Sequence, residues 1–173
     1  MPDQSKEKQK KQGLGRAPEK RVIKLTEGSA RARRTAARLA SVQVLYQMRM
    51  NNQDARSALT DFIENRIGFD LDGDVFVPAD QDMLKMIVLG IQERAMDIDR
   101  MVSGSLGAGN HDDVEILLDG ILRAGAFELL ANGDVDAGII INDYTNVAKG
   151  FYDGGEPKLV NAVLDEISKT VRG

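Results

Sequence analysis

The sequence predicts an all-α protein, and three observations support this fold class. Apolar residues recur at helical spacing in six segments between residues 30 and 172, and capping residues precede most of these segments. No segment shows the apolar and polar alternation of a half-buried strand. With 173 residues, of which 42% are apolar, the chain is long enough for one helical domain with a sizeable core.

The N-terminal segment 1–29 differs in composition from the rest of the chain. It is rich in Lys, Gln, Glu and Gly and has few large apolar side chains, so it cannot bury enough surface to offset the entropy lost on ordering. We predict a disordered basic tail at 1–29 and one helical domain at 30–173. The tail either adds salt-sensitive attraction to RNA or acts only as a solubilising segment.

Charge is distributed unevenly along the chain. Residues 1–38 contain twelve Lys or Arg and four Asp or Glu, whereas the remainder contains eleven and twenty-three, so a net charge of +8 is followed by one of −12. This asymmetry predicts an anionic partner near the start and allows a basic partner elsewhere. The chain has no cysteine, no secretory signal and no apolar run of membrane-spanning length, which favours a cytoplasmic protein without membrane contact.

The first predicted helix covers about residues 30–50, with Ser29 as its N-cap. Its C-terminal half is apolar around nearly the whole circumference, as expected for a helix that is covered on several sides. In its N-terminal half, Arg31, Arg34 and Arg38 share one stripe at about 100° per residue. Guanidinium groups match phosphate geometry, so this arginine ridge predicts contact with a nucleic-acid backbone; ordinary solvated arginines are the alternative.

Two further helices are predicted in the N-terminal half. The second begins at Asp54 or Ser57 and ends near Gly68. The third begins at an Asp80 cap and continues as one helix to about Ser103, because its apolar stripe is unbroken. The aspartate-rich loop between them lacks the glycine and the final glutamate of a calcium-binding loop, so we predict an acidic surface loop.

The fourth predicted helix is apolar on two adjoining faces and is therefore expected to be central. It begins in a capping box formed by Asp112 and Glu115 and ends in a left-handed cap at 132–133. Gly120 and Gly125 cost up to about 1 kcal/mol each inside a helix, which is tolerable where another helix packs closely.

The fifth predicted helix covers about residues 136–151, and the sixth begins at the 155–157 break. We group the six helices into two sets of three, one ending at Ser103 and the other starting at Asp112. The expected architecture is two packed three-helix groups.

Neither a metal site nor an enzyme active site is predicted. His111 is the only histidine and there is no cysteine, so a metal site built on it lacks further ligands of these types. The glycines at 104–109 follow no predicted strand and do not have the spacing of a phosphate-binding loop. No nucleophile with an accompanying base is recognisable. We therefore predict a non-enzymatic protein without a cofactor.

Five segments, taken in order, carry a resemblance to a known family: RRTAARLASVQVLY (33–46), LGI (89–91) with IDRMV (98–102), ILRAGAFEL (121–129), INDYTNVAKGF (141–151) and LVNAVLDEI (159–167). They resemble the NusB family of bacterial transcription antitermination factors over roughly residues 30–172. The resemblance implies two perpendicular three-helix groups and no catalytic activity. It also implies binding of the box A sequence of ribosomal RNA leader transcripts together with NusE, a small-subunit ribosomal protein. That complex helps RNA polymerase to read through terminators.

The resemblance further implies a set of RNA-binding residues: Arg31, Arg33, Arg34, Arg38, Lys149, Phe151 and Lys158. The four arginines match the arginine-rich start of the family's first helix, and the other three match positions near the RNA path. Leu159 stands where the family has Phe, so one base-stacking side chain is missing. Phe151 is either a replacement for it or a core residue of the fifth helix.

The implied protein-partner residues lie on or beside the first and fourth helices: Tyr46, Asp112, Asp113 and Asp119. A basic ribosomal protein suits the acidic remainder of the chain. Leu118 stands at an acidic position of the family, so the charge of this surface has moved or been lost. The alternative to a partner contact is a core position for Tyr46 and a plain surface position for the aspartates.

Two other function classes remain as alternatives. One is a protein-only helical adapter, whose arginines meet an acidic partner without RNA. The other is the RNA-recognition part of an RNA methyltransferase, which the absence of a cofactor-binding α/β unit before Gly173 disfavours. Both a monomer and a homodimer are compatible with the apolar pattern.

Overall fold

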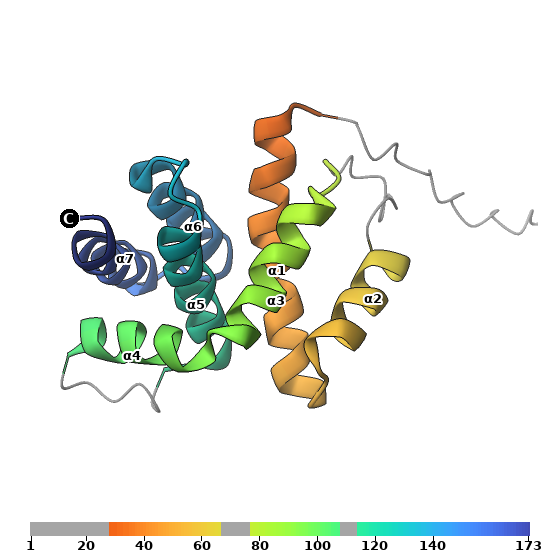
Figure 1. The fold of residues 1–173 in the computed structure, drawn as a ribbon, viewed down its shortest axis with the longest axis horizontal. Coiled ribbons are helices and arrows are strands. Elements are labelled where there is room, and N and C mark those ends of the chain that lie inside the picture. The colour runs from red at the N-terminus through yellow and green to blue at the C-terminus, as the bar shows by residue number, and fades with distance from the viewer. Residues whose placement is uncertain (1–27, 67–76, 108–113) are drawn as a thin grey trace, which may run out of the picture.

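The computed structural model describes residues 28–66, 77–107 and 114–173. Within these ranges every regular element is an α-helix, and Figure 1 shows the arrangement of the seven helices. The predicted all-α fold class is confirmed. Most of the predicted tail, most of the aspartate-rich loop, and His111, Asp112 and Asp113 lie outside the described residues.

The structure contains seven helices among the described residues. In chain order they are α1 (Ala30–Asn51), α2 (Ala55–Asn65), α3 (Gln81–Glu93), α4 (Ala95–Leu106), α5 (Ile116–Ala131), α6 (Ala137–Phe151) and α7 (Glu156–Arg172). No helix among the described residues is long and apolar enough to cross a membrane.

Side-chain caps begin most of these helices where the sequence predicts them. Ser29, Asp54 and Asp80 each accept a hydrogen bond from the backbone N–H three residues later, at 3.0 to 3.1 Å. Asp136 accepts one from Gly138 N–H at 2.7 Å at the start of α6. Each such cap is worth about 1 kcal/mol, so local sequence determines where these helices start.

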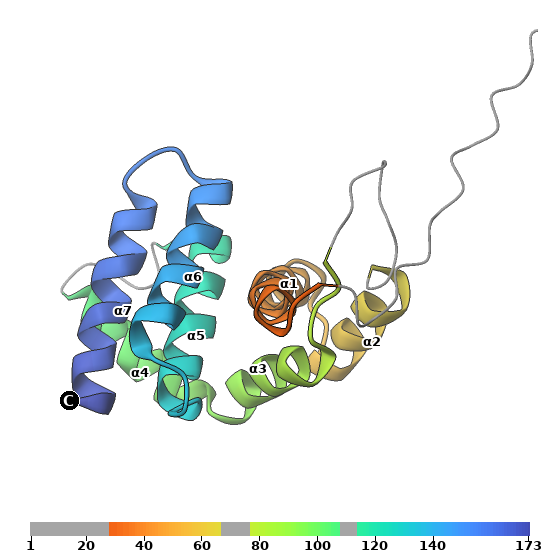
Figure 2. The ribbon, with the colours of Figure 1, turned by 90° about the horizontal axis from the view of Figure 1, so that it is seen from above.

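The third predicted helix is in fact two helices, α3 and α4, with a break at Arg94 (φ −111°). Ile98 and Val102 remain fully buried after the break. The apolar stripe therefore continues although the helix axis changes direction, which is why periodicity alone predicted one helix. Helix α4 packs against α5 and α7, so it belongs with the C-terminal helices and the predicted grouping up to Ser103 is wrong at this point (Figure 2).

Both predicted ends of the fourth helix, here α5, also differ. Helix α5 begins at Ile116, and the Glu115 side chain makes no capping bond but accepts a hydrogen bond from Tyr152 Oη. Asn132 has φ −107°, so the left-handed cap is absent. Instead the guanidinium of Arg172, in the last turn of α7, donates to backbone carbonyls of this end, including Leu129 O and Asn132 O at 2.8 Å each.

Helix α5 is the central element, as predicted from its two apolar faces. In Figure 2, α5, α6 and α7 run side by side and α1, seen end-on, crosses them at a steep angle. A Cβ atom on Gly125 would lie only 2.6 Å from Leu164 Cδ1 of α7, which confirms close helix packing there. At Gly120 the nearest atom, Leu45 Cβ of α1, would be at 3.7 Å, an ordinary contact.

Candidate functional site

The arginines at the start of α1 have different environments. Arg31 and Arg34 are exposed and Arg33 is half-buried, whereas only 2% of Arg38 is exposed. The expectation that all four arginines present their guanidinium groups to RNA is therefore wrong for Arg38. Its side chain points into the protein, where it meets carboxylates of two other helices.

The Arg38 guanidinium binds one carboxylate through two parallel hydrogen bonds and a second carboxylate through another. Its Nε and Nη2 donate to Glu128 Oε2 and Oε1 of α5 at 2.8 and 2.7 Å. Its Nη1 donates to Asp143 Oδ2 of α6 at 2.7 Å. Such bidentate, charge-assisted geometry is the strongest form of side-chain hydrogen bonding in proteins. We call Arg38, Glu128 and Asp143 the buried charge cluster.

Neutral donors complete the buried charge cluster. Tyr144 Oη donates to Glu128 Oε2 at 2.8 Å, and Thr35 Oγ1 donates to Asp143 Oδ2 at 2.9 Å. Burial by itself lowers the pKa of Arg38, but the hydrogen bonds and charges of Glu128 and Asp143 outweigh it, and the net effect raises the pKa. Burial and the Glu128 carboxylate raise the pKa of Tyr144, so this phenol stays a neutral donor.

The sequence contains a signal for this cluster outside the arginine stripe of α1. Glu128 is a charged residue inside the apolar stretch AGAFELLA of α5 (124–131). A carboxylate in such a position needs a buried cation, since unpaired buried charge is very costly. Arg38, the last arginine before the apolar half of α1, is the cation that pairs with Glu128 and also with Asp143.

Arg31 and Arg34 line an open groove with a volume of about 790 Å³, which we call the arginine groove. Arg38 lies at its inner end, and the first turn of α3 and the α5–α6 connection form the other walls. Four aspartates line these walls, Asp80, Asp82, Asp134 and Asp136, together with the apolar side chains of Met83, Met86, Val135 and Ile139. Two of the aspartates, Asp80 and Asp136, cap helices.

The arginine groove is thus mixed in charge and partly apolar. Guanidinium groups and carboxylates line the same groove, so its surface is not uniformly positive. A single strand of RNA presents phosphates on one side and bases, with amino donors and flat apolar faces, on the other. The guanidinium groups of the groove are suited to phosphates. Its aspartates and apolar side chains are suited to bases.

Arg33 contributes its backbone rather than an exposed side chain. Its carbonyl accepts a hydrogen bond from Asp80 N–H at 3.0 Å, which ties α1 to the start of α3. Its Nε is buried and has no hydrogen-bond partner among the described residues.

Lys149, Phe151 and Lys158 lie at the α6–α7 connection, away from the arginine groove. Both lysines are exposed, and Phe151 is 45% exposed, so the alternative that it is a core residue is wrong. Helix α6 has 15 residues, which places its two ends about 22 Å apart. Arg31 and Arg34 lie beside the start of α6, and Figure 2 shows the α6–α7 connection at the opposite end. The predicted RNA-binding residues therefore form two separate clusters.

Of the predicted protein-partner residues, only Tyr46 and Asp119 lie among the described residues. Tyr46 is 39% exposed on α1 and is not a core residue. Asp119 is only 8% exposed and accepts a hydrogen bond from Arg123 Nε at 2.7 Å. Arg123 also pairs with Asp99 Oδ1 at 2.5 Å. Asp119 is therefore part of an ion-pair network and not a plain surface carboxylate.

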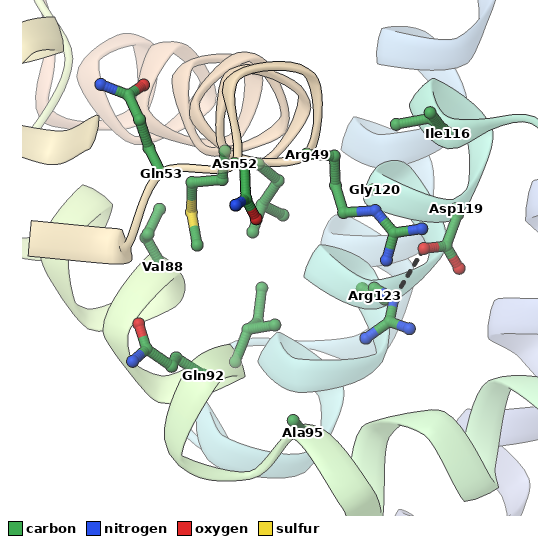
Figure 3. A pocket seen from close by; sticks show the side chains of 13 residues that line it. Arg49, Asn52, Gln53, Val88, Gln92, Ala95, Ile116, Asp119, Gly120 and Arg123 are labelled. Atoms are coloured by element: carbon green, nitrogen blue, oxygen red, sulfur yellow. Dashed lines mark hydrogen bonds and ion pairs between the residues drawn. The ribbon is translucent and has the colours of Figure 1, made fainter. Parts of the chain in front are cut away.

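Asp119 and Arg123 line a second pocket, of about 420 Å³, between the end of α1, α3 and the start of α5 (Figure 3). Its apolar residues include Leu45, Met48, Val88, Ile91 and Ile116, and its polar residues include Arg49, Asn52, Gln53 and Gln92. Tyr46 is not among its lining residues. No metal-binding group of three or more His, Cys, Asp or Glu occurs in the part of the chain that the structure describes.

Comparison with known proteins identifies the family. The NusB family model matches residues 35–169. The transcription antitermination protein NusB of Sinorhizobium medicae (strain WSM419) is 40% identical over 145 residues, which cover 81% of this chain and 88% of that protein. The NusB protein of Bartonella henselae (strain Houston 1) is 37% identical over 141 residues, covering 81% and 89% respectively.

Solved structures show the same fold. A structure of T. maritima NusB matches with a TM-score of 0.67 at 23% identity, covering 79% of this chain and 90% of that chain. A crystal structure of the antitermination factors NusB and NusE in complex with dsRNA matches with a TM-score of 0.67 at 22% identity, covering 82% and 99%. Together with the sequence matches, these findings confirm the family resemblance: the chain belongs to the NusB family, a family of transcription antitermination proteins and not of enzymes.

Proposed function

We propose that this protein is an RNA-binding transcription antitermination factor of the cytoplasm. It binds the box A segment of ribosomal RNA leader transcripts together with NusE and promotes read-through by RNA polymerase. The observation that carries the proposal is the pair of exposed arginines, Arg31 and Arg34, at the arginine groove of a NusB-family protein. A NusB relative of the same fold has been crystallised with NusE and dsRNA, which supports both partners.

The proposed RNA contacts follow from exposure. Arg31 and Arg34 bind phosphates at one end, and Lys149, Phe151 and Lys158 bind at the other, with Phe151 free to stack on a base. Arg33 is a weaker contact because it is half-buried, and Arg38 is removed from the set. Tyr46 is the exposed candidate for the NusE contact, while Asp112, Asp113 and Asp119 stay predictions.

The test measures RNA binding by the full chain, with and without NusE, at several salt concentrations. Each phosphate contact to single-stranded RNA contributes about −0.7 to the slope of log K against log salt. We expect the double variant Arg31→Ala with Arg34→Ala to bind more weakly and to lose about 1.4 of the slope.

The matched control is Arg56→Ala with Arg100→Ala, which makes the same change of net charge on exposed positions of α2 and α4. It is expected to keep the wild-type slope. The proposal is wrong if both double variants behave alike. If the wild type binds NusE but no RNA in either condition, the protein-only adapter becomes the better description.

A further inference from the structure

The buried charge cluster is the feature that the proposed function leaves without a role. It joins three helices, because Arg38 comes from α1, Glu128 from α5 and Asp143 from α6. Arg38 also follows Arg34 by one helical turn and Arg31 by two, on the same stripe of α1. A cluster that holds Arg38 therefore also determines which way Arg31 and Arg34 point.

The other inward-facing side chains of this part of α1 are small. Between residues 30 and 41 the buried residues besides Arg38 are Ala37, Ala40 and Ser41. Such side chains let helices approach closely but provide little shape to resist rotation of α1 about its axis. The planar guanidinium, by contrast, has directional bonds to two carboxylates on different helices, and this geometry permits one rotation of α1.

Two further bonds hold the same turn of α1. Thr35 Oγ1 donates to Asp143, which already accepts from Arg38, so α1 and α6 are joined at two successive turns. Asp80 N–H donates to the carbonyl of Arg33, which fixes the opposite side of α1 to α3. The turn that carries Arg34 thus lies between two attachment points, and Arg38 supplies the stronger of them.

We propose that Arg38 is a positioning residue for RNA binding: through Glu128 and Asp143 it fixes the rotation of α1, so that Arg31 and Arg34 face the arginine groove with the spacing that phosphates require. Buried ion pairs are often no more stabilising than apolar residues of the same size, and their best-attested use is to specify a register. The raised pKa of Arg38 agrees with this role, because the guanidinium keeps its charge at every physiological pH. The inference rests on the proposed function, in which Arg31 and Arg34 bind phosphate.

The test must separate positioning from stability. Arg38→Met alone would leave two carboxylates without their cation, so the main variant combines Arg38→Met with Glu128→Gln and Asp143→Asn, which removes all three charges. Asp143→Asn alone is the milder second variant, because it weakens the link to α6 and keeps the Arg38–Glu128 pair. Val163→Ala, in the core face of α7, is the control for loss of stability at a site that does not touch α1.

We expect the triple variant, at a temperature where circular dichroism shows it folded, to lose up to about 1.4 of the salt slope, as the Arg31 and Arg34 double variant does. Adding Arg31→Ala and Arg34→Ala to the triple variant should cause little further loss, since those arginines no longer engage the RNA in register. Asp143→Asn should lie between the triple variant and the wild type. Val163→Ala should keep the wild-type slope.

The inference is overturned if a folded triple variant, or Asp143→Asn where the triple variant does not fold, keeps the slope and affinity of the wild type. It is also overturned if the losses of the triple and the double variants add fully, because Arg38 then acts independently of Arg31 and Arg34. If the double variant Arg31→Ala with Arg34→Ala keeps the wild-type slope, the proposed function itself is rejected, and the positioning role with it.

Discussion

Arg34 and Arg38 are the same residue type one helical turn apart, and their surroundings give them different roles. Arg34 faces an open groove, where its charge stays hydrated and available to a ligand. Arg38 is enclosed by Glu128 and Asp143, and removing either carboxylate would leave a buried charge partly unpaired. A residue's chemical type thus determines what it can bind, while the neighbouring helices determine whether it is available to bind.

Tyr144 allows a pH test of the buried charge cluster. Its pKa is raised above the ordinary value of 10.0, first by burial and then by the Glu128 carboxylate. Below pH 10 the phenol is protonated in both the folded and the unfolded chain, so its contribution to stability is fully present. As the pH rises further, the unfolded chain loses this proton first, and the free energy of unfolding must fall.

We therefore expect the free energy of unfolding of the wild type to fall more steeply between about pH 10 and about pH 11 than that of Tyr144→Phe, by up to about 1.4 kcal/mol per pH unit. Urea unfolding at several alkaline pH values measures this difference. Tyr152, whose pKa is also raised, is present in both proteins and cancels in the comparison. Parallel pH profiles would show that Tyr144 ionises in the folded state.

At the scale of helices, local sequence determines the starts and tertiary contacts determine several of the ends. Ser29, Asp54, Asp80 and Asp136 cap their own helices through bonds within a few residues. The end of α5 depends instead on Arg172, which is 40 residues away from Asn132 in the sequence. A carbonyl group accepts a hydrogen bond equally well from a distant guanidinium, and no local pattern reveals that donor.

The glycines of the helices provide a matched pair of substitutions. Gly125→Ala would place a Cβ atom 2.6 Å from Leu164 Cδ1, and Leu164 is fully buried. Gly104, in α4, has no atom within 4 Å of an added Cβ. We expect Gly125→Ala to lower the free energy of unfolding by about 1 to 3 kcal/mol through overpacking. Gly104→Ala should raise it by up to about 1 kcal/mol, because alanine favours a helix more than glycine does.

Thermal and urea unfolding of both glycine variants measure these changes. Gly120→Ala is the intermediate case, since its added Cβ would make only an ordinary contact with Leu45. Equal effects at Gly104 and Gly125 would mean that α5 and α7 are packed less closely than the approach of Gly125 to Leu164 indicates.

At the scale of the whole molecule, the charge of the chain opposes RNA binding except near its start. Residues 1–27 contain eight Lys or Arg and four Asp or Glu, a net charge of +4, which leaves −8 for residues 28–173. A protein body of this charge repels a polyanion at long range, and the repulsion is screened by salt. The two exposed basic clusters must act against this field.

We expect deletion of residues 1–27 to weaken RNA binding at low salt more than at high salt and to reduce the salt slope. A full-length variant with the eight Lys and Arg of this segment replaced by Gln should weaken binding at least as much as the deletion, because it removes eight positive charges and keeps the four Asp and Glu. The measurement is RNA affinity at several salt concentrations. Unchanged affinity in both variants would leave the segment with a solubilising role only.

The sequence by itself determined the all-α class, most helix starts and the family, because capping residues, periodicity and the blocks that resemble the family are local properties of the chain. It did not reveal the break at Arg94 or the transfer of α4 to the C-terminal helices, since the apolar stripe is continuous through the break. Nor did it show that Arg38 is buried while Arg34 is exposed.

Only the tertiary structure decided which arginines reach the solvent. Helix geometry places Arg31, Arg34 and Arg38 on one stripe, and nothing within α1 distinguishes them. The distinction comes from Glu128 and Asp143, which are distant in sequence and meet Arg38 only when α1 crosses α5 and α6. Burial of charge depends on long-range packing, so the fold, and not the spacing, assigns one arginine to the core and two to the proposed RNA site.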